Sequence, residues 1–321
     1  MKPLHHALAA AILLAGPALA APKTTPPPKA PAAAPKPVAA PAKPAPDLAY
    51  GAYQRGLYIT ALREATERAR ANPNDAAALT LLGELYNQGL GVPRDWKEAS
   101  AWYRLAAAKG SSHAMAALGM MALEGRGMAK DQKAAREWLE KAAALREPLA
   151  SFNLALVLLD HGADEDIARA VKLLSIAADA EIAEAQHALG VVYARGIGGI
   201  AQDKAAAARL YLRSAYNGSL AGEVEAAIVL FNGDGIAKDE ALAVRHFRHA
   251  AARGNAIAQN RLARLLAVGR VLQKSLVESL SWHILAKRQG LQDPWLEERL
   301  KDVSAEDRAK AEALAEDRSS L

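Results

Sequence analysis

The sequence contains no cysteine and few aromatic residues, and both absences limit what the protein can be. Without cysteine, the 321-residue chain has no disulfide, no thiol nucleophile and no thiolate metal site, so its stability must come from packing. Only 5% of residues are aromatic, whereas 51% are apolar and alanine dominates. Because alanine is the best helix former and β-branched residues are sparse, this composition predicts an all-α fold.

Acidic residues are absent before residue 47, and this absence explains the positive net charge. The formal charge of +5 equals the number of lysines in that segment, namely Lys2, Lys23, Lys29, Lys36 and Lys43. The rest of the chain is therefore formally neutral. Because a nucleic-acid-binding protein carries its excess positive charge on the folded part, we expect no nucleic-acid partner.

Residues 1–20 have the pattern of a secretory signal peptide. Lys2 gives a positive start, an apolar run follows, and Ala18-Leu19-Ala20 is an A-x-A cleavage site. The run is too short to span a bilayer comfortably, so we expect export to the periplasm or beyond and no membrane span after cleavage. The alternative is an uncleaved signal that anchors the protein in the inner membrane.

Residues 21–46 are almost entirely Pro, Ala and Lys, and twelve of the sixteen prolines lie before residue 47. Such a tract buries nothing, so we expect an extended polyproline II spacer or a disordered linker. Its lysines are expected to contact anionic envelope polymers only weakly and without specificity.

From residue 75 onward, one pattern recurs with a period of about 36 residues. Its elements are A-x-x-x-L-G, Y-x-x-G-x-G, D-x-x-x-A-x-x-W-Y and A-A-x-x-G. Six copies are present, of which the third lacks the G-x-G and the fifth has Gly222 and Ala227 in the Ala and Gly positions. The spacing predicts two helices per copy, with small residues where they approach, glycines in the turn, and Asp95 and its equivalents capping the second helix.

These motifs resemble Sel1-like repeats, which are relatives of tetratricopeptide repeats, over about residues 75–290. The resemblance implies a right-handed α-solenoid that recognises proteins through a groove lined largely by the first helix of each repeat. We therefore expect a tetratricopeptide-like helical pair at 47–74, six repeats at 75–290, and capping helices at 291–321.

Three common catalytic and cofactor motifs are missing from the sequence. The sequence has no S-x-x-K, no H-E-x-x-H and no phosphate-binding G-x-x-x-x-G-K-[ST]. His246 and His249 could share a metal, but His246 and His283 occupy the positions of Trp102 and Tyr103 in the repeat, which favours packing. We expect no enzyme, no cofactor and no metal site.

A partner-binding face is predicted from first-helix positions outside the Ala-Leu-Gly stripe. One column reads Glu84, Met120, Leu156, Val191, Ile228 and Arg264. With neighbouring positions, the predicted partner-binding residues are Glu84, Gln88, His113, Met120, Glu124, Asn153, Glu184, Val191, Arg195, Glu225, Arg261 and Arg264. A mixed apolar and polar groove suits a peptide or helix, although the apolar members could instead pack repeat against repeat.

The sequence thus predicts an exported protein–protein interaction scaffold of the bacterial cell envelope, whose partner proteins are not identified. The alternative is a periplasmic protein that binds or cleaves peptidoglycan or another polysaccharide. Against the alternative, no carboxylate pair stands at a defined spacing, and too few first-helix aromatics are present to form a sugar platform.

Overall fold

The computed structural model describes residues 47–162 and 164–319, and within these ranges it contains helices and no strand. The predicted signal peptide and linker lie outside the described residues. The helices are α2 (Leu48–Gln54), α3 (Tyr58–Ala71), α4 (Ala76–Gln88), α5 (Trp96–Ala108), α6 (Ser112–Glu124), α7 (Gln132–Ala144), α8 (Pro148–His161), α9 (Asp164–Asp179), α10 (Ala183–Arg195), α11 (Lys204–Tyr216), α12 (Leu220–Asn232), α13 (Glu240–Ala252), α14 (Ala256–Val268), α15 (Leu276–Arg288), α16 (Pro294–Leu300) and α17 (Ala305–Ser319).

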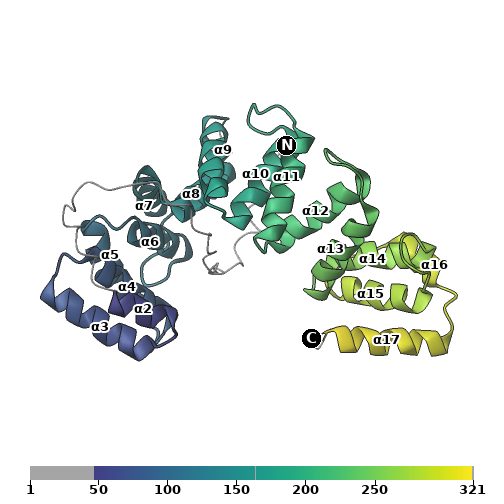
Figure 1. The fold of residues 1–321 in the computed structure, drawn as a ribbon, viewed down its shortest axis with the longest axis horizontal. Helices are drawn as coiled ribbons and strands as arrows, with labels where there is room; N and C mark the ends of the chain where they lie inside the picture. The colour runs from purple at the N-terminus through teal and green to yellow at the C-terminus, as the bar shows by residue number, and fades with distance from the viewer. Residues whose placement is uncertain (1–46, 163, 320–321) are drawn as a thin grey trace, which may run out of the picture. The chain divides into compact units, whose positions relative to one another are not determined.

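The described chain divides into two compact units, 47–145 and 146–319. Each unit is a stack of helix pairs in which the two helices of a repeat pack on each other and on the next repeat (Figure 1). The predicted all-α solenoid is confirmed. No helix of the described ranges is both long and apolar enough to cross a bilayer.

The helices begin and end where the repeat pattern predicts. The side chains of Asp95, Asp131, Asp203 and Asp239 each accept a backbone N–H from the first turn of the following helix. The first glycine of each turn, such as Gly89 at φ 73°, ends the first helix in the left-handed conformation. The third copy keeps this glycine as Gly162, at φ 75°, although its turn is shorter.

Small residues on the first helices make room for side chains of the second helices. A Cβ on Gly83 would lie 2.5 Å from the Tyr103 ring, and a Cβ on Gly190 would lie 2.7 Å from the Tyr211 ring. These glycines therefore allow an aromatic ring to be buried between two closely packed helices, as the motif predicts.

The fifth repeat shows why Gly222 replaces an alanine of the repeat pattern. A Cβ on Gly222 would lie 2.1 Å from the hydroxyl of Ser214, which is fully buried and donates to the Ala183 carbonyl at 2.6 Å. Ser214 itself stands where the other complete repeats have alanine, for example Ala106 and Ala250. The larger residue on one helix is thus matched by a smaller residue on its neighbour.

The second glycine of each G-x-G turn packs against the second helix of the preceding repeat. A Cβ on Gly127 would lie 2.0 Å from the Trp96 carbonyl oxygen, and a Cβ on Gly235 would lie 2.2 Å from the Lys204 carbonyl. Both have positive φ values, of 66° and 74°. The turn glycines therefore join consecutive repeats as well as the two helices within one repeat.

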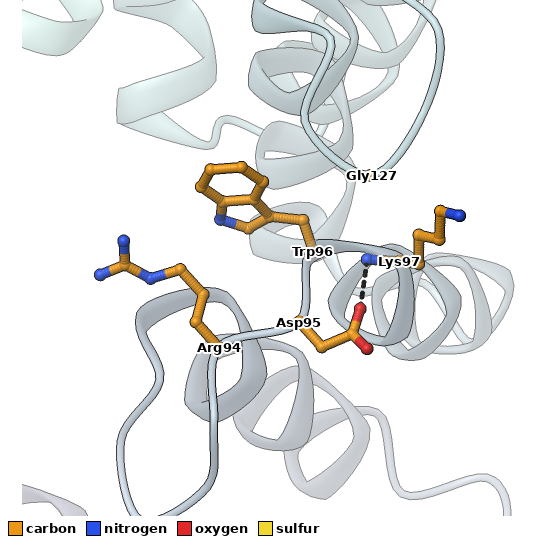
Figure 2. A pocket seen from close by; sticks show the side chains of 5 residues that line it. All are labelled: Arg94, Asp95, Trp96, Lys97 and Gly127. Carbon is orange, nitrogen blue, oxygen red and sulfur yellow. Dashed lines mark hydrogen bonds between the residues drawn. The ribbon is translucent and has the colours of Figure 1, made fainter.

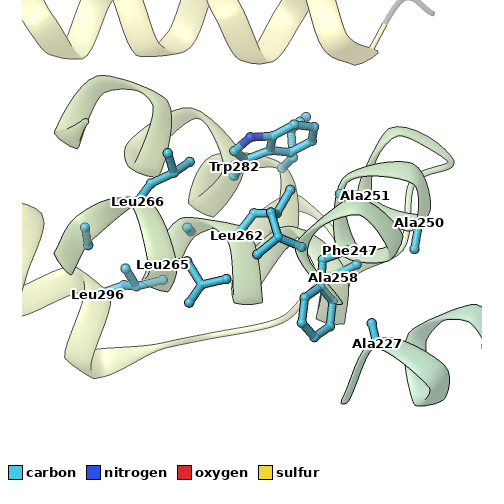
Figure 3. Close-up of a cluster of buried hydrophobic side chains, with 14 of the residues drawn as sticks. Ala227, Phe247, Ala250, Ala251, Ala258, Leu262, Leu265, Leu266, Trp282 and Leu296 are labelled. Carbon is cyan, nitrogen blue, oxygen red and sulfur yellow. The ribbon is translucent and has the colours of Figure 1, made fainter. Parts of the chain in front are cut away.

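The core is built from alanine and leucine with a few large aromatic rings. In the unit 146–319, Phe247 and Trp282 pack with Leu262, Leu266 and several alanines (Figure 3). Buried apolar surface of this kind stabilises folds by about 25 cal/mol per Å². It also fixes the first helices, whose remaining surface forms the candidate site.

Candidate partner-binding site

All twelve predicted partner-binding residues lie on first helices, but their exposure differs. His113, Glu124, Arg195 and Arg261 are exposed. Asn153 and Val191 are only 8% and 6% exposed, so they offer little surface to a partner. The other six are half-buried, and these are Glu84, Gln88, Met120, Glu184, Glu225 and Arg264. Val191, an apolar residue of the predicted column, packs with Tyr211 and Val229. At this position the side chain therefore packs one repeat against the next.

In the unit 47–145, Glu84 is held by an internal hydrogen-bond network. The buried Tyr103 hydroxyl donates to Glu84 Oε2 at 2.6 Å, and the Gln88 amide donates to Glu84 Oε1. Burial, and then the charge of Glu84, raise the pKa of the Tyr103 hydroxyl, so it stays a donor. Glu84 and Gln88 are therefore engaged within the protein.

The α6 residues of the same unit are more open. The Glu124 carboxylate forms an ion pair with Arg126 at 2.8 Å, and the Glu124 side chain is 28% exposed. Met120 is half-buried, and the His113 imidazole is exposed. On α6 this unit therefore presents a half-buried methionine together with an exposed histidine.

In the unit 146–319, four side chains from three helices form a polar cluster. His187 and Arg195 come from α10, Tyr211 from α11 and Glu225 from α12. The His187 and Tyr211 rings lie with centroids 5.9 Å apart. Burial raises the pKa of the Glu225 carboxyl, and the positive charge of Arg195 only partly opposes that shift.

His187 and Tyr211 stay neutral in this cluster. Burial, and then the charge of Arg195, lower the pKa of the His187 imidazole to about 4. Burial and the charge of Glu225 raise the pKa of the Tyr211 hydroxyl. His187 and Tyr211 therefore add no formal charge to the cluster at neutral pH.

The Glu225 carboxylate lacks a hydrogen-bond donor from the described residues, since its interactions there are electrostatic ones with Arg195 and Tyr211. Burying a carboxylate without donors costs free energy, so a ligand that supplies a donor would gain from it. Glu225 was predicted from its first-helix position. Tyr211 was missed, although it occupies the Tyr position of the W-Y motif.

Arg264 has a structural contact that the sequence pattern does not indicate. Its guanidinium binds Asp293 through two hydrogen bonds of 2.6 and 2.8 Å, and Asn260 adds a third at 2.7 Å. Burial would raise the pKa of Asp293, but these bonds outweigh it and hold the pKa at about 2. Because Asp293 also caps α16, Arg264 fastens that helix to α14.

His246 and His249 lie near a buried carboxylate. The His249 Nδ1 atom lies 2.7 and 2.8 Å from the two oxygens of the buried Glu223 carboxylate, and His246 Nδ1 lies 3.5 Å from it. His283 is buried, as its repeat position predicts. Among the described residues, no group of three or more His, Cys, Asp and Glu is arranged to hold a metal ion.

Comparison with known proteins identifies the repeats. The Sel1 repeat model matches six segments, which are 76–111, 112–146, 148–181, 183–219, 222–255 and 256–291. Among proteins with curated descriptions, none matches this sequence.

Two solved structures are similar to the chain. A Sel1 repeat protein from Oxalobacter formigenes has a TM-score of 0.66 and 27% identity, over 75% of this chain and 98% of that one. A protective antigen present in uropathogenic Escherichia coli strains, which displays an SLR fold, has a TM-score of 0.55 and 20% identity, over 82% of this chain and 64% of that one. The second shares the fold alone. Sel1 repeats are generally protein–protein interaction modules, and their solenoid is typically a non-catalytic scaffold. With six matched repeats and this fold, the chain belongs to the Sel1 repeat family.

Proposed function

We propose that this protein is an exported scaffold of the bacterial cell envelope that binds a segment of a partner protein in the groove of its 146–319 unit. Two features support the proposal. Residues 1–20 have the charge, apolar run and A-x-A site of a signal peptide. The Sel1 repeats supply a rigid surface of a kind that generally recognises proteins.

The observation that carries the groove assignment is the half-buried Glu225 carboxylate. It lies in an environment that raises its pKa, and no described residue donates a hydrogen bond to it. A peptide that brings a lysine ammonium, an arginine guanidinium or a backbone N–H would satisfy it. Because charge-assisted hydrogen bonds are about twice as strong as neutral ones, a basic side chain is the favoured occupant.

Arg195 gives the groove a second, complementary contact. Its guanidinium is exposed and stands at the end of α10, where it can bind a carbonyl or carboxylate of the same peptide. Ile228, which is half-buried on the same helix as Glu225, supplies apolar surface. A segment with a basic residue flanked by apolar residues fits this arrangement of charge and apolar surface.

The proposal is tested by site-specific photo-crosslinking in cells. A photoreactive amino acid replaces Arg195 in the groove or, as the matched control, Arg209, which is exposed on the second helix α11. We expect a small, reproducible set of envelope proteins to crosslink at position 195 and not at position 209. Glu225→Gln should weaken that crosslinking by about tenfold, because a charged contact is lost. Glu165→Gln, on the second helix α9, should leave the crosslinking unchanged.

The same experiment separates the scaffold from the polysaccharide-binding alternative. Crosslinked glycan fragments without a dominant protein at position 195 would contradict the proposal and favour a cell-wall-binding function. Equal protein crosslinking at positions 195 and 209 would show non-specific contact and would also contradict it.

A further inference from the structure

A second candidate surface lies on the turn edge of the unit 47–145, away from the first-helix stripe. A cavity of about 470 Å³ is lined there by Arg94, Asp95, Trp96, Lys97 and Gly127. Figure 2 shows the Trp96 indole and the Arg94 side chain on one side of the turn, with the Lys97 side chain on the other. We call this surface the Trp96 edge, and it shares no residue with the proposed groove.

Trp96 is unusual at its position in the repeat. It is the first residue of α5, and the equivalent positions in other repeats hold Gln132, Lys204, Glu240 and Leu276. Its side chain is 39% exposed although indole is among the most apolar groups. Tryptophan is enriched in protein interfaces because it combines a large apolar surface with few rotatable bonds.

Two basic residues, Arg94 and Lys97, and one acidic residue, Asp95, line the cavity at the Trp96 edge. The only acidic side chain lining the cavity, Asp95, turns to the N–H groups of Lys97 and Glu98, at 2.8 and 3.1 Å, and caps α5 (Figure 2). The Lys97 ammonium has no partner in the described part of the chain, and Arg94 makes one long bond of 3.3 Å to the Gln88 carbonyl. Both cations are therefore available to a ligand.

A third cation lies against the indole. The Arg126 guanidinium lies 5.6 Å from the Trp96 ring centroid. The same guanidinium forms an ion pair with the Glu124 carboxylate at a distance of 2.8 Å. Gly127 beside it approaches the backbone of Trp96 so closely that the turn is fixed in place. The arrangement is thus a rigid aromatic surface with basic groups around it, which needs little reorganisation to bind.

We propose that the Trp96 edge binds an acidic peptide segment of a partner protein, with an apolar side chain on the indole and carboxylates on Arg94 and Lys97. Guanidinium groups match carboxylates in geometry and charge. A sugar platform would instead pair the ring with acceptor groups for hydroxyls, and the carboxylates of Asp95 and Glu124 are already engaged within the protein. Together with the groove, this surface would let one scaffold hold two partners of opposite charge.

The test follows the indole N–H signals of the full-length protein by NMR. The chain has five tryptophans, so a Trp96→Phe variant assigns the relevant signal. The probe is a short synthetic peptide of alternating Asp-Glu pairs and leucines, and its Asn-Gln counterpart is the uncharged control. We expect the acidic peptide alone to shift the Trp96 signal in a saturable, salt-sensitive way and to leave the other indole signals unchanged.

Variants then locate the contact. Arg94→Glu, followed on the Trp96 signal, should weaken binding by about tenfold, as expected for loss of an interface Arg. Trp96→Ala lacks that signal, and isothermal titration with the same peptide should show a similar loss. Lys274→Glu is the matched control, because Lys274 is exposed at the Arg94 position of the last repeat. Circular dichroism checks that each variant is folded.

Three results would overturn the proposal. The first is no saturable shift of the Trp96 signal with the acidic peptide at low salt. The second is an equal loss of binding in Lys274→Glu, which would indicate general charge attraction. The third is stronger binding of polygalacturonate or of a single-stranded oligonucleotide than of the peptide, which would assign another class of polyanion. Because the groove lies in the other unit, none of these results bears on the Glu225 crosslinking test.

Discussion

At the scale of single residues, Glu225 combines a cost in stability with a candidate role in binding. Burial raises its pKa above the ordinary value, so the folded state holds this proton more tightly than the unfolded state. Stability therefore falls as pH rises from the ordinary carboxyl pKa through the folded one. A group that destabilises the fold at neutral pH is typical of a ligand-binding site, where stability is reduced in favour of function.

This sign leads to the first prediction. Glu225→Gln should be more stable than the parent protein at neutral pH, and the difference should vanish near pH 4, where the carboxyl is protonated in both states. Urea unfolding at several pH values measures it. Glu225→Gln should also lose crosslinked partners. If the variant is more stable than the parent protein, that loss cannot be caused by unfolding. A loss of stability at neutral pH would contradict the proposed environment of Glu225.

His187 gives the opposite pH dependence. Its folded pKa of about 4 lies below the ordinary 6.5, so the unfolded state binds the proton between these values. The free energy of unfolding therefore has its full His187 contribution above pH 6.5. This contribution falls by no more than about 3 kcal/mol as the pH drops toward 4. His187→Phe, which keeps a ring beside Tyr211, should remove this fall in urea titrations. His113→Phe is the control for losing an exposed histidine, and an unchanged slope in His187→Phe would contradict the prediction.

Val271 is strained where other repeats have glycine. It has φ 63° at the position of Gly127 and Gly235, and its side chain is 46% exposed. An L-residue in this conformation costs about 1–2 kcal/mol, while glycine costs about 0.5–1 kcal/mol in chain entropy. Val271→Gly should therefore stabilise the protein by about 1 kcal/mol in urea unfolding.

A nearby valine provides the control for that experiment. Val268 is 45% exposed and ends α14 in a helical conformation. Val268→Gly should destabilise the protein, because glycine there loses entropy without relieving strain. If both substitutions destabilised equally, strain at Val271 would be excluded.

At the scale of the elements, the repeat is held together by its turns. The residue that follows the first turn glycine contacts the first residue of the second helix of the preceding repeat, and the contacting pair differs from repeat to repeat. Asp234 binds Lys204 at 3.1 Å, Arg270 binds Glu240 at 2.6 Å, and Arg126 lies over Trp96. The same backbone geometry thus accommodates either an ion pair or a cation–π contact.

The close approach of the turn predicts a difference between two glycines. Gly235→Ala should destabilise by at least 2–3 kcal/mol, because the new Cβ meets the Lys204 carbonyl at 2.2 Å in addition to the cost of positive φ. Gly254→Ala should cost only about 1 kcal/mol, since Gly254 has φ 85° but nothing within 4 Å of its Cβ. Thermal or urea unfolding compares them, and equal losses would mean that the contact between repeats is unimportant.

At the scale of the whole molecule, we propose that the N-terminal segment directs the scaffold to export. Cleavage after Ala20 would give a mature protein that begins at Ala21. We expect intact-mass measurement of protein from the periplasmic fraction to find this N-terminus, and Ala18→Arg to block the cleavage. A protein that keeps residues 1–20 and stays in the cytoplasm would refute export but would leave both proposed binding surfaces to be judged by their own tests.

The repeat frame is local, and for that reason the sequence alone determined it. The Ala, Leu and Gly positions, the capping aspartates and the turn glycines follow from helix periodicity and backbone sterics within a few residues. The helices of each repeat, their caps and the family could therefore be predicted. The role of Gly222 could not, because it depends on Ser214 on the preceding helix.

The environment of each groove residue was decided only by the tertiary structure. Glu84 and Glu225 both lie on first helices outside the Ala-Leu-Gly stripe, yet Glu84 accepts two hydrogen bonds and Glu225 accepts none from the described residues. Arg264 is bound to Asp293, 29 positions away. The physical reason is that burial and partners depend on how neighbouring repeats stack, whereas periodicity specifies only the face on which a residue lies.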